Sequence, residues 1–316
     1  MSTADELHVV IGAGPVGTAL ATRLVADGRR VRLLSRSGRA AATGAESAAV
    51  DASDPDALSR HAAGAAAIYN CANPGAYPKW EKFWPPLAAS ILTAAERTGA
   101  VLVTASNLYG YGPPAGPMTR HTPLNPSDHK GALRARMWAE ALAAHQAGRV
   151  RVAEARSSDY IGPTLPLSSG LLPRYADATL AGKAATVFSD PDQPHSWAKI
   201  DDVAATLAAL GRDERAWGSA WIVPSPPPVT VRDALRDLSN VVDAGEPRLR
   251  AAPRWMLRAG AAAVPMLREV SGMLYQFDAP FIVDGDETTQ TFGIQPTPWP
   301  QVVAETAPAW HRRAVA

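Results

Sequence analysis

The chain has 316 residues, of which 47% are hydrophobic and 19% charged, as in an ordinary globular protein with one large or two modest domains. Its 31 basic and 30 acidic residues form no block of one sign, so we expect neither nucleic acid nor a membrane surface as a partner. The single cysteine, Cys71, excludes an internal disulfide framework and a cysteine-rich zinc site, and no metal is expected.

Neither the N-terminal segment nor the most apolar late segment reads as a membrane or export signal. MSTADELHVV has acidic residues where a signal peptide needs basic ones, so we expect a cytoplasmic protein. Residues 255–274 are apolar but include Arg258, Arg268 and Glu269, which a lipid-exposed span would not tolerate. We expect a core or interface helix there.

Short apolar runs alternate with helical patterns through the first two thirds of the chain. The predicted strands are residues 7–11, 31–35, 66–71, 101–106 and 150–156, and the predicted helices are 17–28, 54–64, 86–99 and 127–140. This alternation predicts an α/β fold with a doubly wound parallel (Rossmann) sheet, covered by helices on both faces. Left-handed glycines are expected to end helices at Gly28, Gly64, Gly99 and Gly148.

The first predicted strand runs directly into the pattern G-x-G-x-x-G and then into a helix. Glycines at these positions permit a tight turn and close approach of the backbone to a pyrophosphate, while the helix N-terminus supplies N–H donors. We therefore expect a dinucleotide pyrophosphate to bind at Gly12, Gly14, Pro15, Val16 and Gly17.

The end of the second strand bears on the choice of cofactor. Ser35, Arg36 and Ser37 stand where an NAD-preferring enzyme would have Asp or Glu. A guanidinium group can pair with a 2′-phosphate and stack on the adenine, so the predicted cofactor is NADP(H); a solvated surface arginine is the alternative. Asp51 is placed either to meet the adenine amino group or simply to close a turn.

After residue 160 the chain becomes proline-rich and less periodic, until KIDDVAATLAALG at 199–211 is helical again. Such irregular segments usually surround a substrate. We predict an NADP-binding Rossmann domain over residues 1–160 that resumes at about 195–224. A smaller C-terminal substrate-binding region is predicted over 161–194 and 225–316.

Five landmarks, in this order, resemble the short-chain dehydrogenase/reductase superfamily in its extended form, the NAD-dependent epimerase/dehydratase type. They are the phosphate loop, YNCANP at 69–74, VTASNLYGYGP at 103–113, ARSSDYIGP at 155–163 and HSWAKIDDVA at 195–204. The resemblance implies further cofactor contacts at Cys71, Ala72, Asn73, Thr104, Lys130 and Ser158. It also implies substrate contacts at Asp159 and Tyr160.

The resemblance also suggests roles for segments outside these landmarks. The aromatic residues Trp80, Phe83 and Trp84 would either roof the substrate pocket or pack in a dimer interface, and packing is favoured. Extended relatives often form homodimers through two helices, which here would be residues 85–98 and 131–147.

The chain departs from the family pattern in two places. Family members carry G-x-x-G-x-x-G, whereas Ile11 stands at the first glycine position here and a glycine follows at 12, as in the atypical branch. In the family, a Ser or Thr four residues before the tyrosine of YG and a Tyr-x-x-x-Lys pair polarise and protonate the substrate carbonyl. Counting back from Tyr109 reaches Ala105, and the helix that should carry Tyr-x-x-x-Lys has no tyrosine.

Two alignments of the helix at 127–140 remain open. The first places Lys130 at the tyrosine position and Arg134 at the lysine position. The second places Ala132 and Arg136 there, because Arg136 and Glu140 fit the family's K-x-x-x-E spacing. In the first alignment both basic side chains lie on one helical face, and we expect both to face the cofactor.

Hydride transfer without the tyrosine needs another proton donor. Lys130 would serve if a neighbouring cation such as Arg134 weakened its hold on the proton; otherwise it binds a ribose hydroxyl or is a surface charge. Tyr111 is a second candidate, and Ser106 either orients the carbonyl or caps the loop. We expect Lys130→Met to change stability little.

Together these features predict an NADP(H)-dependent oxidoreductase that acts on a carbonyl or hydroxyl of a small organic molecule, without the usual Tyr-x-x-x-Lys pair. A non-catalytic NADP(H)-binding sensor is the alternative, because a fold persists when its catalytic residues are lost. A nucleotide-sugar epimerase or dehydratase is the third hypothesis.

Overall fold

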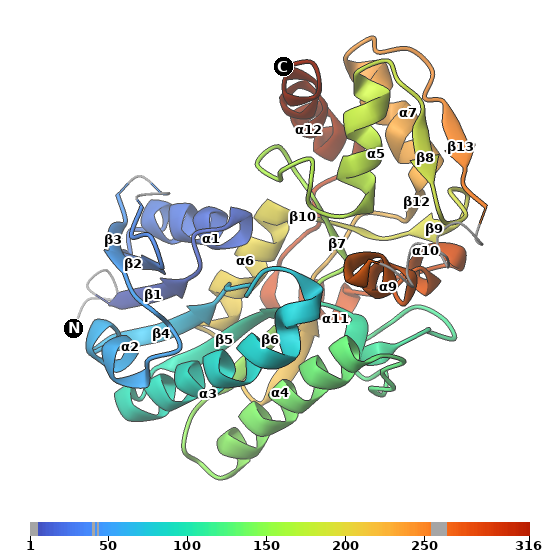
Figure 1. The fold of residues 1–316 in the computed structure, drawn as a ribbon. Coiled ribbons are helices and arrows are strands. Elements are labelled where there is room, and N and C mark those ends of the chain that lie inside the picture. The colour runs from blue at the N-terminus through green and yellow to red at the C-terminus, as the bar shows by residue number, and fades with distance from the viewer. Residues whose placement is uncertain (1–5, 40–41, 43, 254–263) are drawn as a thin grey trace.

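The computed structural model describes residues 6–39, 42, 44–253 and 264–316, so residues 255–263 of the segment expected to be a helix at 255–274 lie outside the described residues, and Pro265–Ser271 of it is helical. The centre of the molecule is a seven-stranded parallel sheet with the order β11-β6-β5-β4-β1-β2-β3 (Figure 1). Its strands are β1 Leu7–Ile11, β2 Arg30–Ser35, β3 Glu46–Ala49, β4 Ala65–Asn70, β5 Val101–Ser106, β6 Val152–Arg156 and β11 Ser219–Ile222. The predicted doubly wound α/β fold is confirmed.

Helices cover both faces of this sheet because successive strand residues point to opposite sides. In β1, Val10 packs in the core beneath α1 (Pro15–Ala26) and α6 (Ile200–Leu210). Val9 and Ile11 belong to the core on the opposite face. That face is covered by α2 (Pro55–His61), α3 (Trp80–Thr98) and α4 (His129–Gln146).

The predicted helix ends are confirmed, whereas one predicted helix start is wrong. Gly28, Gly64, Gly99 and Gly148 all have a positive φ of 70 to 75°. Helix α3, however, begins at Trp80 and not at residue 86, although two prolines lie inside it. Trp80 is 2% exposed, and its packing with the following turn of helix outweighs the hydrogen bonds that the prolines remove.

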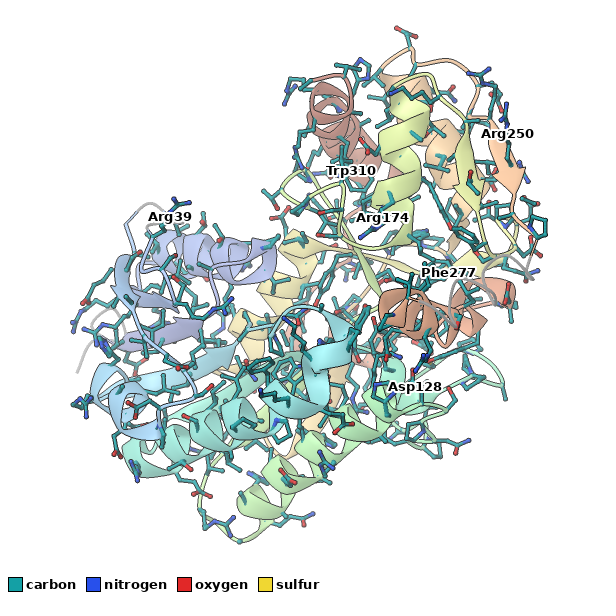
Figure 2. All side chains as sticks on the ribbon, in the orientation of Figure 1. Arg39, Asp128, Arg174, Arg250, Phe277 and Trp310 are labelled. Atoms are coloured by element: carbon teal, nitrogen blue, oxygen red, sulfur yellow. The ribbon has the colours of Figure 1, made fainter. Side chains whose placement is uncertain are left out.

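The C-terminal part of the chain adds a second cluster of helices beside the sheet (Figure 1). Helices α5 (Leu171–Leu180), α7 (Val231–Val241) and α12 (Trp299–Ala314) share one core. Trp310 of α12 is fully buried there and donates a hydrogen bond to the Gly162 carbonyl at 3.0 Å (Figure 2). The domain boundaries expected from the sequence remain a prediction.

Short elements connect this cluster to the sheet. Three two-stranded sheets join β7 Asp159–Ile161 to β10 Trp197–Lys199, β9 Pro194–His195 to β12 Val229–Thr230, and β8 Ala185–Val187 to β13 Leu249–Ala251. The short helices are η2 Tyr77–Lys79, η3 Tyr109–Tyr111, η4 Glu214–Ala216, α9 Pro265–Ser271, α10 Tyr275–Asp278 and α11 Asp286–Phe292. No helix among the described residues is both long and apolar enough to cross a membrane.

Candidate functional site

The turn between β1 and α1 has the backbone that a pyrophosphate requires. Gly12 has φ +104°, and a Cβ there would lie 2.7 Å from the Cys71 carbonyl oxygen. A Cβ at Gly17 would lie 1.8 Å from the Gly12 carbonyl oxygen. At Gly14, by contrast, a Cβ would meet no heavy atom of the described residues within 4 Å beyond its chain neighbours. The outer glycines therefore serve close packing, and the middle one faces open space where a pyrophosphate fits.

The end of β2 presents an unpaired cation. Arg36 is exposed and makes no hydrogen bond or ion pair with any described residue. Its neighbour Ser35 accepts a hydrogen bond from the Gly38 N–H at 3.1 Å, which shapes the turn beside it. Asp51 closes a turn by accepting the Ser53 N–H at 3.0 Å, and its side chain is exposed. The choice between NADP(H) and NAD(H) at these positions remains a prediction.

The residues expected to line the nicotinamide half follow β4, β5 and β6, whose carboxyl ends meet at one edge. The Cys71 N–H donates to Ile11 at 2.9 Å, and burial raises the pKa of its thiol to about 12, so Cys71 is a packing residue and no thiolate. Asn73 accepts from the Gly75 N–H at 3.3 Å. The hydroxyl of Ser158 is buried and has no hydrogen-bond partner in the described part of the chain. An unsatisfied hydroxyl here fits a polar ligand such as a nicotinamide dinucleotide.

The structure favours one of the two alignments of α4. Asp128 is its N-cap, and Lys130 is only 1% exposed. Arg134 also points inward, whereas Ala132 and Arg136 are exposed. Arg136 pairs on the surface with Glu140, at 3.9 Å. The inward-facing Lys130 and Arg134 fit the first alignment better, and their correspondence to the family's Tyr-x-x-x-Lys pair stays a prediction.

The ammonium group of Lys130 is held by two carboxylates. Its Nζ lies 2.6 Å from Asp128 Oδ2 and 2.7 Å from Glu269 Oε2 of α9. It also lies 5.8 Å from the centre of the Tyr77 ring. This arrangement neutralises and anchors the lysine, as in a structural ion pair; direct proton donation by Lys130 remains a prediction.

Arg134 has different neighbours. Its guanidinium stacks on the Trp84 ring at 4.3 Å and on the Trp80 ring at 5.4 Å. Burial lowers its pKa, and Glu154 opposes the effect. Its Nε and Nη1 have no hydrogen-bond partner within the described residues. Trp80 is buried, and its indole N–H donates to the Gly75 carbonyl at 3.0 Å. It is therefore a packing residue and has no exposed surface for a substrate, contrary to the expected substrate contact.

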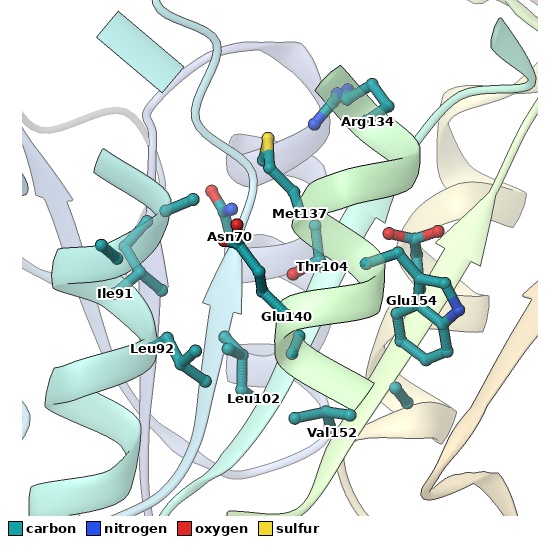
Figure 3. Close-up of a pocket in the computed structure, with 15 residues that line it drawn as sticks. Asn70, Ile91, Leu92, Leu102, Thr104, Arg134, Met137, Glu140, Val152 and Glu154 are labelled. Atoms are coloured by element: carbon teal, nitrogen blue, oxygen red, sulfur yellow. The ribbon is translucent and has the colours of Figure 1, made fainter. Parts of the chain in front are cut away.

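A crevice lies behind Arg134, between α3, α4 and the sheet (Figure 3). It has about 550 Å³ of empty space, including open solvent, and Asn70, Thr104, Met137 and Glu154 line it. Its walls come from α3 and α4, the helices expected to form a homodimer, and from the sheet, including Asn70 at the carboxyl end of β4. Dimer formation remains a prediction.

Tyr111 and Ser106, two sequence candidates for catalysis, are buried. The Tyr111 hydroxyl donates to the Thr119 carbonyl at 3.2 Å and accepts from Arg156 Nη1 at 2.8 Å. Because its proton is already engaged, Tyr111 is poorly placed to protonate a substrate. Ser106 is 3% exposed at the end of β5, and its carbonyl accepts the Ser157 N–H at 3.2 Å.

Another pair of tyrosines joins η2 to η3. The hydroxyls of Tyr77 and Tyr109 are 2.9 Å apart. Burial raises the pKa of each, so both phenols hold their protons. The sequence reading missed Tyr77, which lies in η2 after β4; its contact with Tyr109 of η3 brings it to the site.

A buried histidine that the sequence reading did not select lies beside Asp159. His195 Nε2 is 2.9 Å from Asp159 Oδ2, and the histidine side chain is 1% exposed. The segment HSWAKIDDVA had pointed to this region, but nothing in it indicated the partner. Among the described residues, no group of three or more His, Cys, Asp or Glu is arranged to hold a metal ion.

Comparison with known proteins agrees with this arrangement. The NAD dependent epimerase/dehydratase family matches residues 8–220. No curated protein matches the sequence significantly. Among solved structures, UDP-glucose 4-epimerase from Thermotoga maritima, determined with UDP-glucose, has a TM-score of 0.79 at 14% identity, covering 97% of this chain and 99% of that one.

Two further solved structures are similar over almost their whole length. The dTDP-glucose 4,6-dehydratase from Bacillus anthracis, in complex with NAD, has a TM-score of 0.78 at 15% identity, covering 98% of this chain and 97% of that one. MoeE5, in complex with UDP-glucose and NAD, has a TM-score of 0.77 at 19% identity, covering 98% and 100%. These likenesses establish the fold, and the family match extends over most of the chain. The chain therefore belongs to the NAD-dependent epimerase/dehydratase family.

Proposed function

We propose that this protein is an enzyme of epimerase or dehydratase type that binds a nicotinamide dinucleotide and oxidises or reduces a hydroxyl-bearing carbon of a sugar-like molecule. The family match and the solved relatives, whose structures contain UDP-glucose or NAD, agree better with this third hypothesis than with a general carbonyl reductase or a sensor. The observation that carries the proposal is the open phosphate loop at Gly14 beside an edge with a buried, unsatisfied Ser158 hydroxyl.

Different residues of the chain would bind the cofactor and act on the substrate. Gly12, Gly14 and Gly17 would hold the pyrophosphate, and Ser158 would bind the nicotinamide half. A bound nicotinamide supplies hydride transfer. The protein must then orient the substrate hydroxyl and move its proton, and it must do so without the family's tyrosine.

We further propose a preference for NADP(H). The support is local: Arg36 is exposed and unpaired among the described residues, and no carboxylate stands at the end of β2 to take both ribose hydroxyls. The relatives in complex with NAD do not decide this preference, because their identity to this chain is 15 to 19%.

Charge at the substrate edge favours the neutral, hydroxyl-rich part of a ligand. Three carboxylates gather there, Asp128, Asp159 and Glu269, and Lys130 is the cation that two of them neutralise. Carboxylates accept hydrogen bonds from sugar hydroxyls but repel phosphates. A sugar ring would therefore lie here, with any diphosphate farther along the cleft.

The test is conversion of defined sugars. Purified protein is incubated with UDP-glucose, dTDP-glucose or free hexoses and NADP⁺ or NAD⁺, and products are followed by proton NMR together with nicotinamide absorbance. Formation of an epimer or a dehydrated keto sugar, without net reduction of the cofactor, supports the proposal. If the protein converts no sugar but oxidises NADPH stoichiometrically with carbonyl compounds, the reductase hypothesis is favoured instead. Cofactor binding without any turnover would favour the sensor hypothesis.

A further inference from the structure

His195 in β9 is fixed at both ring nitrogens. Its Nδ1 lies 3.0 Å from the Gln276 carbonyl oxygen, and its Nε2 lies 2.9 Å from Asp159 Oδ2. The ring stacks on Phe277, with centroids 4.6 Å apart and planes 5° apart, and lies 4.3 Å from the Trp197 ring. The imidazole therefore has no room to turn toward other partners.

These two contacts determine where protons must lie. A carbonyl oxygen can only accept, so Nδ1 must carry a proton. Nε2 faces a carboxylate oxygen, and without a proton between them two sets of lone pairs would repel each other at 2.9 Å. The pair is therefore satisfied when it holds one proton beyond the one on Nδ1, shared between Nε2 and Oδ2. That proton is transferable.

Asp159 is the member of the pair that a substrate can reach. Its side chain is 30% exposed, against 1% for His195. It lies in β7, directly after Ser158, whose buried hydroxyl is unsatisfied among the described residues. It is thus at the edge of the sheet where the nicotinamide half of the cofactor is expected.

The tyrosines around the pair are poor competitors for this role. Burial raises the pKa of four tyrosines near Asp159, and the charge of Asp159 adds to the increase in each: Tyr77, Tyr109, Tyr160 and Tyr275. Phenols with raised pKa values keep their protons at neutral pH and cannot act as bases. The other charged groups at this edge are Asp128, Lys130, Arg134 and Glu269, of which Lys130 is already paired with two carboxylates.

We infer that Asp159 and His195 form the acid–base pair of this site and take the place of the family's tyrosine. The inference rests on the proposed function. Asp159 is the catalytic residue, because it would touch the substrate oxygen. His195 is a positioning residue that holds the proton in reserve behind it.

The proton balance of the step is closed within the site. In the reducing direction the substrate carbon takes a hydride from the bound nicotinamide, and the single proton that Asp159 shares with His195 passes through Asp159 to the substrate oxygen. The product is an alcohol, and the pair is left one proton short. In the oxidising direction the substrate hydroxyl returns its proton to Asp159 as the hydride leaves, and the pair is filled again.

The first experiment needs neither substrate nor activity. In protein labelled with ¹⁵N-histidine and ¹³C-aspartate, NMR follows the His195 ring nitrogens and the Asp159 carboxyl through a pH titration. We expect both residues to report the loss of one shared proton together, and Asp159→Asn to change the His195 ring-nitrogen signals. Independent titration of the two groups, or an unchanged His195 in the variant, would overturn the inference.

The second experiment measures the chemistry. In single turnovers at several pH values, we expect Asp159→Asn to slow hydride transfer by about 100-fold or more, with cofactor affinity nearly unchanged. His195→Gln should shift the pH profile of the rate. The matched control is His121→Gln. This variant breaks a contact of 3.0 Å between His121 and Glu287, whose side chains are 70% and 48% exposed. It should leave the rate of hydride transfer and its pH profile unchanged.

The outcomes separate this inference from the proposed function. A parent protein that converts substrate, and whose Asp159→Asn variant keeps the parent rate and pH profile, overturns the acid–base pair alone. A parent that converts no sugar overturns the proposed function, and the NMR titration still decides whether the pair shares a proton. If His195→Gln does not fold, the partly exposed Asp159 still provides the test.

Discussion

The ammonium group of Lys130 lies 2.7 Å from Glu269 Oε2, and this buried ion pair ties the start of α4 to α9. The lysine side chain is 2% exposed and the glutamate side chain 12%. This enclosure argues against the expectation that Lys130→Met would change stability little, because that expectation took Lys130 for a group beside the cofactor and not for one enclosed by carboxylates.

Lys130→Met should lower the free energy of unfolding by about 3 to 5 kcal/mol, since it leaves Glu269 and Asp128 without their cation. Urea denaturation measures the effect. Arg136→Met is the matched control on the same helix: its pair with Glu140 is 3.9 Å long, with both side chains more than half exposed, and its loss should cost at most about 1 kcal/mol. Equal losses of unfolding free energy in the two variants would show that the buried Lys130 pair contributes no more to stability than an exposed pair.

Substitutions at two glycines of the phosphate loop should both weaken cofactor binding, but only one of them should lower stability. At Gly14 a side chain meets open space, and its φ of −81° suits any residue, so Gly14→Val should abolish cofactor binding while the melting temperature barely changes. At Gly17 a Cβ would overlap the Gly12 carbonyl, so Gly17→Ala should lower both affinity and stability. Calorimetric titration with NADPH and NADH, together with thermal unfolding, distinguishes them. Normal binding by Gly14→Val would mean that the pyrophosphate lies elsewhere.

Arg36→Ala tests the cofactor preference. If the guanidinium pairs with the 2′-phosphate, the parent should bind NADPH at least about tenfold more tightly than NADH, and the variant should lose most of that difference. Arg60→Ala removes an exposed arginine of α2 and serves as the control. Equal affinity of the parent for the two cofactors would contradict the NADP(H) assignment without affecting the fold or the family.

His8 should make stability depend on pH. It is 3% exposed in β1, with Nδ1 3.1 Å from the Tyr69 hydroxyl oxygen, and burial lowers its pKa from 6.5 to about 4. As pH falls through this interval the unfolded chain takes up a proton and the native chain does not, so stability is full above about 6.5 and decreases below it, by up to about 3 kcal/mol.

The measurement compares urea denaturation at neutral pH and at about pH 5. His8→Asn can still hydrogen-bond the Tyr69 hydroxyl but does not titrate, so its loss of stability on acidification should be smaller than that of the parent. An equal loss in both proteins would assign the pH dependence to other groups.

The sequence alone was sufficient for the fold and for the glycine turn between β1 and α1. Both depend on local features: apolar residues at strand and helix spacing, and glycines where a turn needs them, as at Gly12 and Gly28, which have φ of +104° and +75°. Strand β3 was missed because ESAA has no β-branched or aromatic residue, and its pairing with β2 makes it a strand.

The partners of the site residues were decided only by tertiary structure. The sequence selected Lys130, Arg134 and Asp159, but it did not show that Lys130 faces Glu269, that Arg134 stacks on Trp84, or that Asp159 meets a histidine 36 residues away. Such contacts leave no periodic trace in the chain, because they form where α4 meets α9 and α3 and where β7 meets β9. A charged residue's chemistry depends on the burial and the partner that this packing creates.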